Sequence, residues 1–154
     1  MMTTRSTSER GLRKIKETLE GYQVPYHVTH ILNTQTTQEV EDILRIGNSE
    51  MGMMLIITLG EEAHQMVNAS RIPSLNAVVA CLDKKPYEAW AGLTLLPDQA
   101  YVLGAENAGR FAAQVLSARN PGIRNALGAA IAAKEAELNA AGDRIHQETQ
   151  YLGR

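Results

Sequence analysis

The run MMLIITL at residues 53–59 decides the fold class of this chain. Every residue in it except Thr58 is apolar, so both faces of a strand formed here would have to be covered, as they are in the parallel sheets of α/β proteins. Gly60 ends the run, and Glu61 and Glu62 follow where carboxylates favour the first turn of a helix. The stretch therefore predicts a buried parallel strand that leads into a helix over residues 61–70.

Strands and helices alternate outward from this run in both directions. Residues rich in β-branched and aromatic side chains predict further strands at 24–32, 75–80 and 100–103. Apolar residues at three- and four-residue spacing predict helices at 8–22, 36–47, 87–93, 105–119 and from Asn120-Pro121 onward. This alternation predicts a mainly parallel sheet with right-handed crossovers, within one domain over residues 1–154.

Polar residues mark where three of these helices begin. Ser8 is a candidate N-cap, Thr36 and Glu39 have the spacing of a capping box, and Asn120 precedes Pro121 as an N-cap precedes the first helical position. Residues 1–8 are polar and contain no strand-like apolar run, so we expect a start that is flexible or ordered by a ligand.

The last helix carries an apolar stripe that has to rest on another surface. Its members recur at seven-residue intervals or extend that series toward the helix start: Ile123, Leu127, Ile131, Leu138 and Ile145. Only 5% of the 154 residues are aromatic, which favours additional burial between subunits.

The overall composition excludes several classes of protein. A formal net charge of −2 gives no general attraction to nucleic acid or anionic lipid. The single Cys81 cannot form an internal disulfide, and no apolar run approaches the length of a membrane span. We therefore expect a cytoplasmic protein without a nucleic-acid or membrane partner.

The segment GAENAGRFAAQVL at residues 104–116 resembles, without a gap, a pattern of the PurE family, the carboxyaminoimidazole ribonucleotide mutases and aminoimidazole ribonucleotide carboxylases. Three further segments match in the same order: Val24-Pro25-Tyr26, Ala63-His64 and Pro97. The resemblance implies a flavodoxin-like three-layer parallel sheet, no cofactor, and an octamer in which a C-terminal helix at 121–150 packs on neighbouring subunits. Alternatively, alanine-rich helices of unrelated α/β folds look alike, although they do not explain several matches in order.

The first site motif of the family, an apolar strand followed by Gly-Ser-x-Ser-Asp, is altered. Its place is taken by Thr4-Arg5-Ser6-Thr7-Ser8, and almost nothing precedes it, so we expect the first strand to be shortened or missing. The hydroxyls of Ser6, Thr7 and Ser8, with Arg5, are candidates to receive an anion at a helix N-terminus. The other interpretation is a Ser/Thr-rich tail that ends in an N-cap.

The second and third motifs are altered as well. The family's Ser-Ala-His-Arg-Thr-Pro, whose histidine shuttles a proton, aligns with residues 32–37, where Asn33, Thr34 and Gln35 cannot titrate. The family's Gly-Gly-Ala-Ala-His segment keeps Gly60 and His64 but gains Glu61 and Glu62. Two carboxylates there would repel an anionic ligand, or they are simply solvated residues of a first helical turn. His64 is either a ligand contact or an ordinary polar residue of a helix.

Three functions follow from this pattern. The first is a non-catalytic PurE-like pseudoenzyme that forms a homo-oligomer and binds a nucleotide or related phosphorylated ligand at subunit junctions. The second is a divergent mutase or carboxylase of purine biosynthesis in which His64 has a new role, and the third is a scaffold or regulatory subunit. The histidines and Cys81 have no metal-ligand spacing, so no metal is expected. The candidate ligand-binding residues are Arg5, Ser6, Thr7, Ser8, Asn33, Thr34, Gln35, Gly60, His64 and Asn107.

Overall fold

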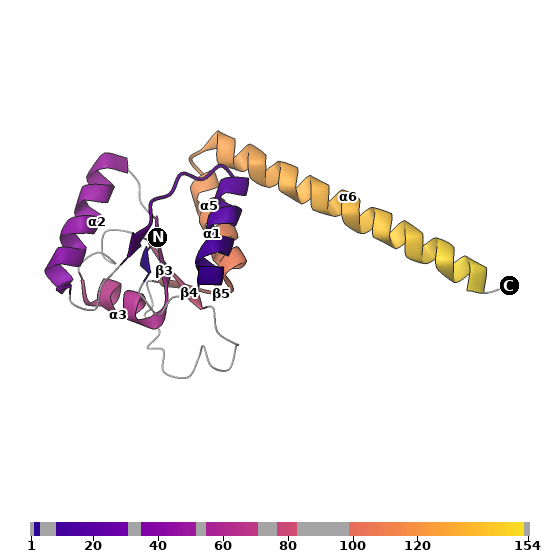
Figure 1. The fold of residues 1–154 in the computed structure, drawn as a ribbon. Helices are drawn as coiled ribbons and strands as arrows, with labels where there is room; N and C mark the ends of the chain where they lie inside the picture. Colours follow the sequence, from indigo (N-terminus) through magenta and orange to yellow (C-terminus); the bar gives the residue numbers. More distant parts are fainter. Residues whose placement is uncertain are drawn as a thin grey trace.

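The computed structural model describes residues 2–3, 9–30, 35–51, 55–70, 77–82 and 99–152, and it centres on a five-stranded parallel sheet (Figure 1). The strands are β1 Met2–Thr3, β2 Thr29–His30, β3 Leu55–Leu59, β4 Ala77–Leu82 and β5 Gln99–Leu103. The helices are α1 Glu9–Gly21, α2 Thr37–Met51, α3 Glu61–Ala69, α5 Ala105–Ser117 and α6 Pro121–Leu152. The strand order β2-β1-β3-β4-β5 is that of flavodoxin-like proteins, so the predicted fold class is confirmed.

The helices lie in two layers, one on each face of the sheet (Figure 1). Side chains alternate between the two faces along β3, where Ile57 and Leu59 join the core beneath α1 and α5, while Ile56 joins the core beneath α2 and α3. Because both faces are covered, β3 and β4 are almost wholly apolar, as the run at 53–59 predicts.

The first strand is shortened rather than missing. β1 has two residues, which pair with β2 on one side and with β3 on the other (Met2 with Thr29 and Thr58, Thr3 with His30 and Leu59). Of the two predicted alternatives, a shortened or a missing first strand, the structure shows the shortened one at Met2–Thr3, while residues 4–8, including the predicted N-cap Ser8, lie outside the described residues.

The strand predicted at 24–32 is also corrected over residues 24–28, which do not form a strand; Thr29–His30 form β2, and residues 31–32 lie outside the described residues. Two causes act together. Pro25 has no N–H to donate to a neighbouring strand, and the described residues of β1 pair with Thr29 and His30 rather than with residues 24–28. Smaller differences are that α2 continues to Met51 instead of ending near Gly47, and that the helix predicted at 87–93 lies outside the described residues.

Two predicted helix starts have the expected hydrogen bonds. The Glu39 backbone N–H donates to Thr36 Oγ1 at 3.3 Å, and the Thr36 N–H donates to Glu39 Oε2 at 2.6 Å, which completes the capping box. The Thr36 N–H, and the Thr36 hydroxyl, which also donates to Glu39 Oε2 at 3.0 Å, lower the pKa of the Glu39 carboxyl. At α6, Asn120 Oδ1 accepts from the N–H groups of Gly122 at 3.0 Å and Ile123 at 3.3 Å.

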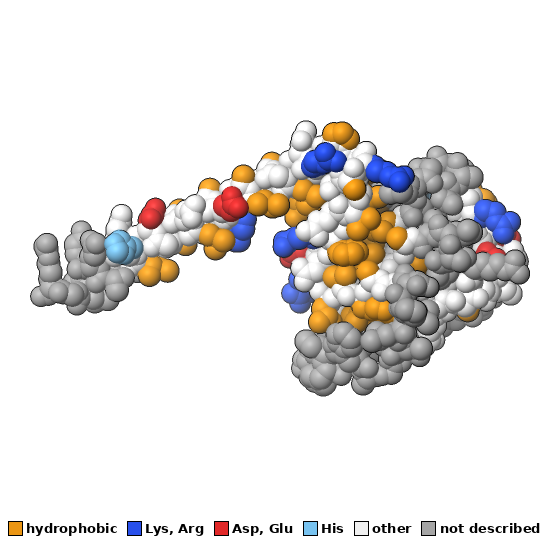
Figure 2. Space-filling model, turned by 180° about the vertical axis from the view of Figure 1, so that it is seen from behind, with side chains coloured by type: hydrophobic (Ala, Val, Ile, Leu, Met, Phe, Trp, Pro, Cys, Tyr) orange, Lys and Arg blue, Asp and Glu red, His pale blue; other side chains and the backbone are white. Residues whose placement is uncertain are grey.

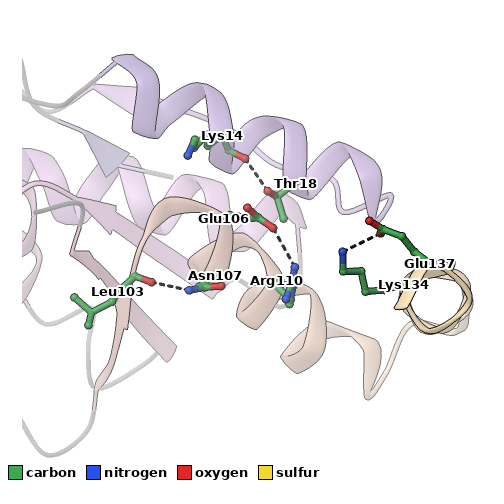
Figure 3. A network of polar contacts seen from close by, with 8 residues as sticks. All are labelled: Lys14, Thr18, Leu103, Glu106, Asn107, Arg110, Lys134 and Glu137. Atoms are coloured by element: carbon green, nitrogen blue, oxygen red, sulfur yellow. Dashed lines mark hydrogen bonds and ion pairs between the residues drawn. The ribbon is translucent and has the colours of Figure 1, made fainter. Parts of the chain in front are cut away.

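Helices α1 and α5 lie side by side, and Gly109 sets how closely they approach (Figure 1). A Cβ placed on Gly109 would lie 2.9 Å from both Cβ and Cγ2 of Thr18. Figure 3 shows Thr18 on α1 facing the turn of α5 that carries Glu106 and Arg110, an ion pair of 3.0 Å. The glycine inside the segment GAENAGRFAAQVL is therefore a packing residue for this helix pair.

Helix α6 begins against the core and then projects away from it as a long arm (Figure 1). Ile123 and Leu127 are buried near its start, whereas Ile131, Leu138 and Ile145 are 58%, 60% and 65% exposed. Figure 2 shows apolar side chains following this arm. The part of the predicted stripe from Ile131 to Ile145 is therefore not buried by the described part of the chain. Among the described helices none is both long and apolar enough to cross a membrane.

Candidate functional site

The carboxyl edge of the sheet carries two glycine turns of the same kind. Gly60 follows β3 with φ 96°, and Gly104 follows β5 with φ 85°, conformations that residues with a Cβ rarely adopt. Each glycine leads directly into a helix, α3 or α5, and neither cap position supplies a side-chain hydrogen bond to the first turn. Ligands of doubly wound sheets bind at this edge, and a helix N-terminus favours an anion.

Gly60 lies at the point where the order of the strands reverses. Leu59, the residue before it, pairs with Thr3 at the end of β1, and the chain leaves β1 toward β2 on the other side. In flavodoxin-like sheets the ligand lies over this junction of β1 and β3. The segment that follows Thr3 contains the predicted Arg5, Ser6, Thr7 and Ser8, which lie outside the described residues and remain predictions, as do Asn33 and Thr34.

Asn107 stabilises the second glycine turn from the exposed side of α5. Its Nδ2 donates to the carbonyl oxygen of Leu103 at 2.9 Å (Figure 3), and the Gly104 N–H donates to the Leu82 carbonyl oxygen at 3.0 Å. The amide side chain is exposed, and Asn107 lies in the first turn of the helix. Gln35 is half-buried immediately before the capping box of α2.

His64 lies in the first turns of α3 behind Gly60, and its side chain is only 4% exposed. Both ring nitrogens have partners: Nδ1 lies 3.3 Å from Thr58 Oγ1, and Nε2 lies 3.0 Å from Asn68 Nδ2. Burial lowers the pKa of the imidazole, because the charged form loses more hydration than the neutral form. In this structure His64 is therefore a neutral, internally bonded side chain rather than one that offers a free nitrogen to the edge.

The hydrogen bonds of His64 extend across the same face of the sheet through three residues that sequence reasoning missed: Asn68, Gln99 and Tyr101. Gln99 Nε2 donates to Asn68 Oδ1, the Tyr101 hydroxyl donates to Gln99 Oε1 at 3.5 Å, and the Tyr101 ring meets the His64 ring edge-on with centroids 5.6 Å apart. We define the polar chain as Thr58, His64, Asn68, Gln99 and Tyr101. Its sequence signals are Thr58 inside an apolar run, Asn68 four residues after His64, and polar residues alternating on β5.

Register explains why the histidine ring has room here. Thr58, Ala80 and Tyr101 are paired neighbours across β3, β4 and β5, so their side chains leave the sheet on one face. Ala80 is the smallest of the three and lies between the other two. Among the described residues no group of three or more His, Cys, Asp or Glu side chains is placed to hold a metal ion.

Two crystal structures of proteins from Treponema denticola are similar to this one over almost their whole length. One is PurE, with a TM-score of 0.72, 16% identity, and coverage of 93% of this chain and 95% of that one. The other is a point-substituted PurE2, with a TM-score of 0.70, 16% identity, and coverage of 93% and 94%. A scan against protein-family models finds no match, and no curated protein matches the sequence. At this identity the comparison shows a PurE-like fold.

Proposed function

We propose that this chain with a PurE-like fold is a non-catalytic, self-associating cytoplasmic protein that binds a nucleotide or related phosphorylated small ligand at the carboxyl edge of its sheet. The observation that carries the proposal is a contrast between two parts of the site. The edge keeps two positive-φ glycines in front of helix N-termini, while the one histidine that it shares with the family's motifs is buried, neutral and bonded at both nitrogens.

The first half of this contrast supports binding. A phosphate at the edge can accept from backbone N–H groups of a first helical turn, and it interacts favourably with the positive end of the helix. The glycines remove the Cβ atoms that would stand between the backbone and a ligand at each strand end. Asn107 adds an exposed, uncharged amide in the first turn of α5, where the carboxylate of Glu106 is paired with Arg110.

The second half supports loss of catalysis. Moving a proton to or from a substrate needs a group that titrates near neutral pH and reaches the substrate. His64 has a pKa lowered by burial and would have to break a hydrogen bond to reach out. Gln35, which stands in the segment aligned with the family's catalytic histidine, has no titrating group.

The binding proposal is tested with a panel of nucleoside monophosphates, phosphorylated sugars and inorganic phosphate, using isothermal titration calorimetry. Asn107→Asp places a carboxylate at the edge and should weaken the best ligand at least ten-fold. Gln114→Glu adds the same charge on an exposed turn near the other end of α5 and should leave affinity unchanged. Absence of binding by every compound refutes the ligand, and equal effects of the two variants refute the location.

The catalytic alternative has its own test. If the protein complements a purine auxotroph that lacks the mutase, and His64→Gln abolishes complementation, the enzyme interpretation replaces the non-catalytic one. Failure to complement at normal expression, with calorimetric binding retained, supports the proposal.

Self-association is proposed from the uncovered part of α6 together with the resemblance. Three large apolar side chains at seven-residue spacing on an exposed helix are costly in water and suit burial against a second copy. Leu138→Lys should reduce the mass measured by light scattering to a smaller species, whereas Glu137→Lys, an exposed change on the same helix, should not. A wild-type monomer, or a complex only with another protein from the host, would contradict self-association and favour a scaffold subunit.

A further inference from the structure

We infer that the polar chain Thr58–His64–Asn68–Gln99–Tyr101 is a reversible hydrogen-bond relay, in which protonation of His64 turns both amides over and converts the Tyr101 hydroxyl from a donor into an acceptor. This inference concerns the interior behind α3 and β5 and goes beyond the proposed function, since it holds whether or not a ligand binds at the edge.

The contacts along the polar chain fix one direction of donation when His64 is neutral. Tyr101 donates to Gln99 Oε1, Gln99 Nε2 donates to Asn68 Oδ1, and Asn68 Nδ2 points at His64 Nε2. An amide nitrogen carries two hydrogens and no lone pair for accepting, so Nε2 has to be the acceptor. The remaining hydrogen of the neutral ring is then on Nδ1, which donates to Thr58 Oγ1 at 3.3 Å.

A proton on Nε2 makes this direction impossible. An imidazolium ring donates from both nitrogens, so Nε2 would face the hydrogens of Asn68 Nδ2. Turning the Asn68 side-chain amide over presents Oδ1 to His64 and Nδ2 to Gln99. Gln99 then has to turn over as well, and its Nε2 donates to the Tyr101 oxygen.

The side-chain types in the polar chain allow this reversal. Both ends are hydroxyl groups, which donate and accept equally well, and both middle members are amides, which exchange donor and acceptor by a half turn. A carboxylate, an arginine or a lysine at any of these positions would fix one direction. The chain therefore offers partners to His64 in both protonation states without moving the backbone.

Within the described residues, the surroundings of His64 are mostly apolar. Among the described residues, Tyr101 is the titratable group in ring contact with His64. The core that α2, α3, β3 and β4 contribute on this face is apolar and consists of Val40, Leu44, Ile56, Ala63, Val67 and Val78. Burial, rather than a charged neighbour, is what lowers the pKa of His64.

The first experiment observes the wild-type protein and uses a substitution only to assign a signal. Nitrogen-15 NMR distinguishes the two neutral tautomers of histidine and follows protonation, and His64→Gln assigns the signal. At pH above the transition we expect His64 as the Nδ1–H tautomer. A neutral Nε2–H tautomer would overturn the assigned direction.

Three variants then test transmission along the chain. Asn68→Asp can only accept, so it should favour the doubly protonated ring and raise the proton affinity of His64 at least ten-fold. Tyr101→Phe keeps the ring contact but removes the acceptor that Gln99 Nε2 needs in the reversed state, so it should lower that affinity about three-fold. In an Asn68→Leu background the hydrogen bonds of the polar chain are interrupted at residue 68, and Tyr101→Phe should have no effect on the proton affinity of His64.

These outcomes separate the relay from a purely structural network. If Tyr101→Phe leaves the titration of His64 unchanged in the otherwise native protein, or changes it equally in the Asn68→Leu background, the proposed transmission is wrong. If Asn68→Asp fails to raise the proton affinity, the contact between residues 64 and 68 is not the one that reverses.

Discussion

Replacing Gly109 by Ala probes the close contact between α1 and α5. The new Cβ would lie 2.9 Å from two carbon atoms of Thr18, whereas non-bonded carbon atoms are most stable about 3.5–4.0 Å apart. Rotating the Thr18 side chain does not relieve the overlap, because its own Cβ is one of the two atoms. In addition, Thr18 Oγ1 donates to the Lys14 carbonyl oxygen at 2.7 Å, which favours the present rotamer (Figure 3). The helices therefore have to separate by about 0.6 Å or more.

The magnitude follows from two opposing effects. Alanine stabilises a helix interior by about 1 kcal/mol relative to glycine, and overpacking a well-packed contact costs about 1–3 kcal/mol. Gly128 on α6 supplies the matched control, since nothing lies within 4 Å of the Cβ that alanine would add there. Gly128→Ala should therefore gain helix stability alone, and Gly109→Ala should be less stable than Gly128→Ala by about 1–3 kcal/mol.

The assay is urea unfolding followed by circular dichroism at one fixed protein concentration, because association shifts apparent stability. Thr18→Ala, combined with Gly109→Ala, should recover part of the loss, since the contact with Cγ2 disappears while that with Cβ remains. Equal stabilisation by Gly109→Ala and Gly128→Ala would refute the steric argument. Additivity of the Thr18 and Gly109 changes would show that the two residues do not share the strain.

Three further outcomes are expected. Because burial lowers the pKa of His64 in the folded state, the unfolded chain binds a proton at higher pH than the folded protein does. The contribution of His64 to the free energy of unfolding should be complete above about pH 6.5 and should fall by up to about 1.4 kcal/mol per pH unit as the pH decreases toward the folded pKa. His64→Gln should flatten this part of the dependence of unfolding free energy on pH. Thr36→Ala should cost about 1 kcal/mol in urea unfolding through loss of the capping box, while Thr37→Ala, one residue on, should cost less than half as much. Gly104→Ala should cost about 1–3 kcal/mol from backbone strain alone, since the nearest atom to the new Cβ is 3.8 Å away; a neutral result in thermal unfolding would contradict the positive φ.

Sequence reasoning located the parts of the fold that depend on local chemistry. The apolar run before Gly60 predicts a doubly covered strand, and the polar residues Thr36, Glu39 and Asn120 predict helix starts that the hydrogen bonds confirm. Such features succeed because each is decided within a few residues of chain. The segment at 104–116 indicated the PurE-like fold for a different reason, since it encodes both a glycine turn and a helix packing surface.

The parts that sequence reasoning missed depend on which strands become neighbours. Residues 24–28 of the strand predicted at 24–32 do not form a strand, because the described residues of β1 pair with Thr29 and His30, and nothing within 24–32 records where β1 would lie. Likewise, Asn68 and Gln99 are 31 residues apart and meet only because α3 covers the face that β5 shares. For His64, the residue type was a sound signal of a polar contact, but only the packing shows that both nitrogens point inward.

The short pairing of β1 with its neighbours gives the sheet a weak junction near its centre, which we call the seam: Met2 and Thr3 with their partners on β2 and β3. Strands β3, β4 and β5 are joined along five paired residues at each boundary, whereas β1, within the described residues, pairs over two residues with β2 and over two with β3. Local unfolding at that seam should therefore occur far more often than global unfolding and should release Thr29 and His30 while Ile56 and Val79 stay protected. In amide hydrogen exchange the molecule should thus behave as a stable three-strand unit with a loosely attached flank, and a ligand that spans β1 and β3 would slow exchange on the flank.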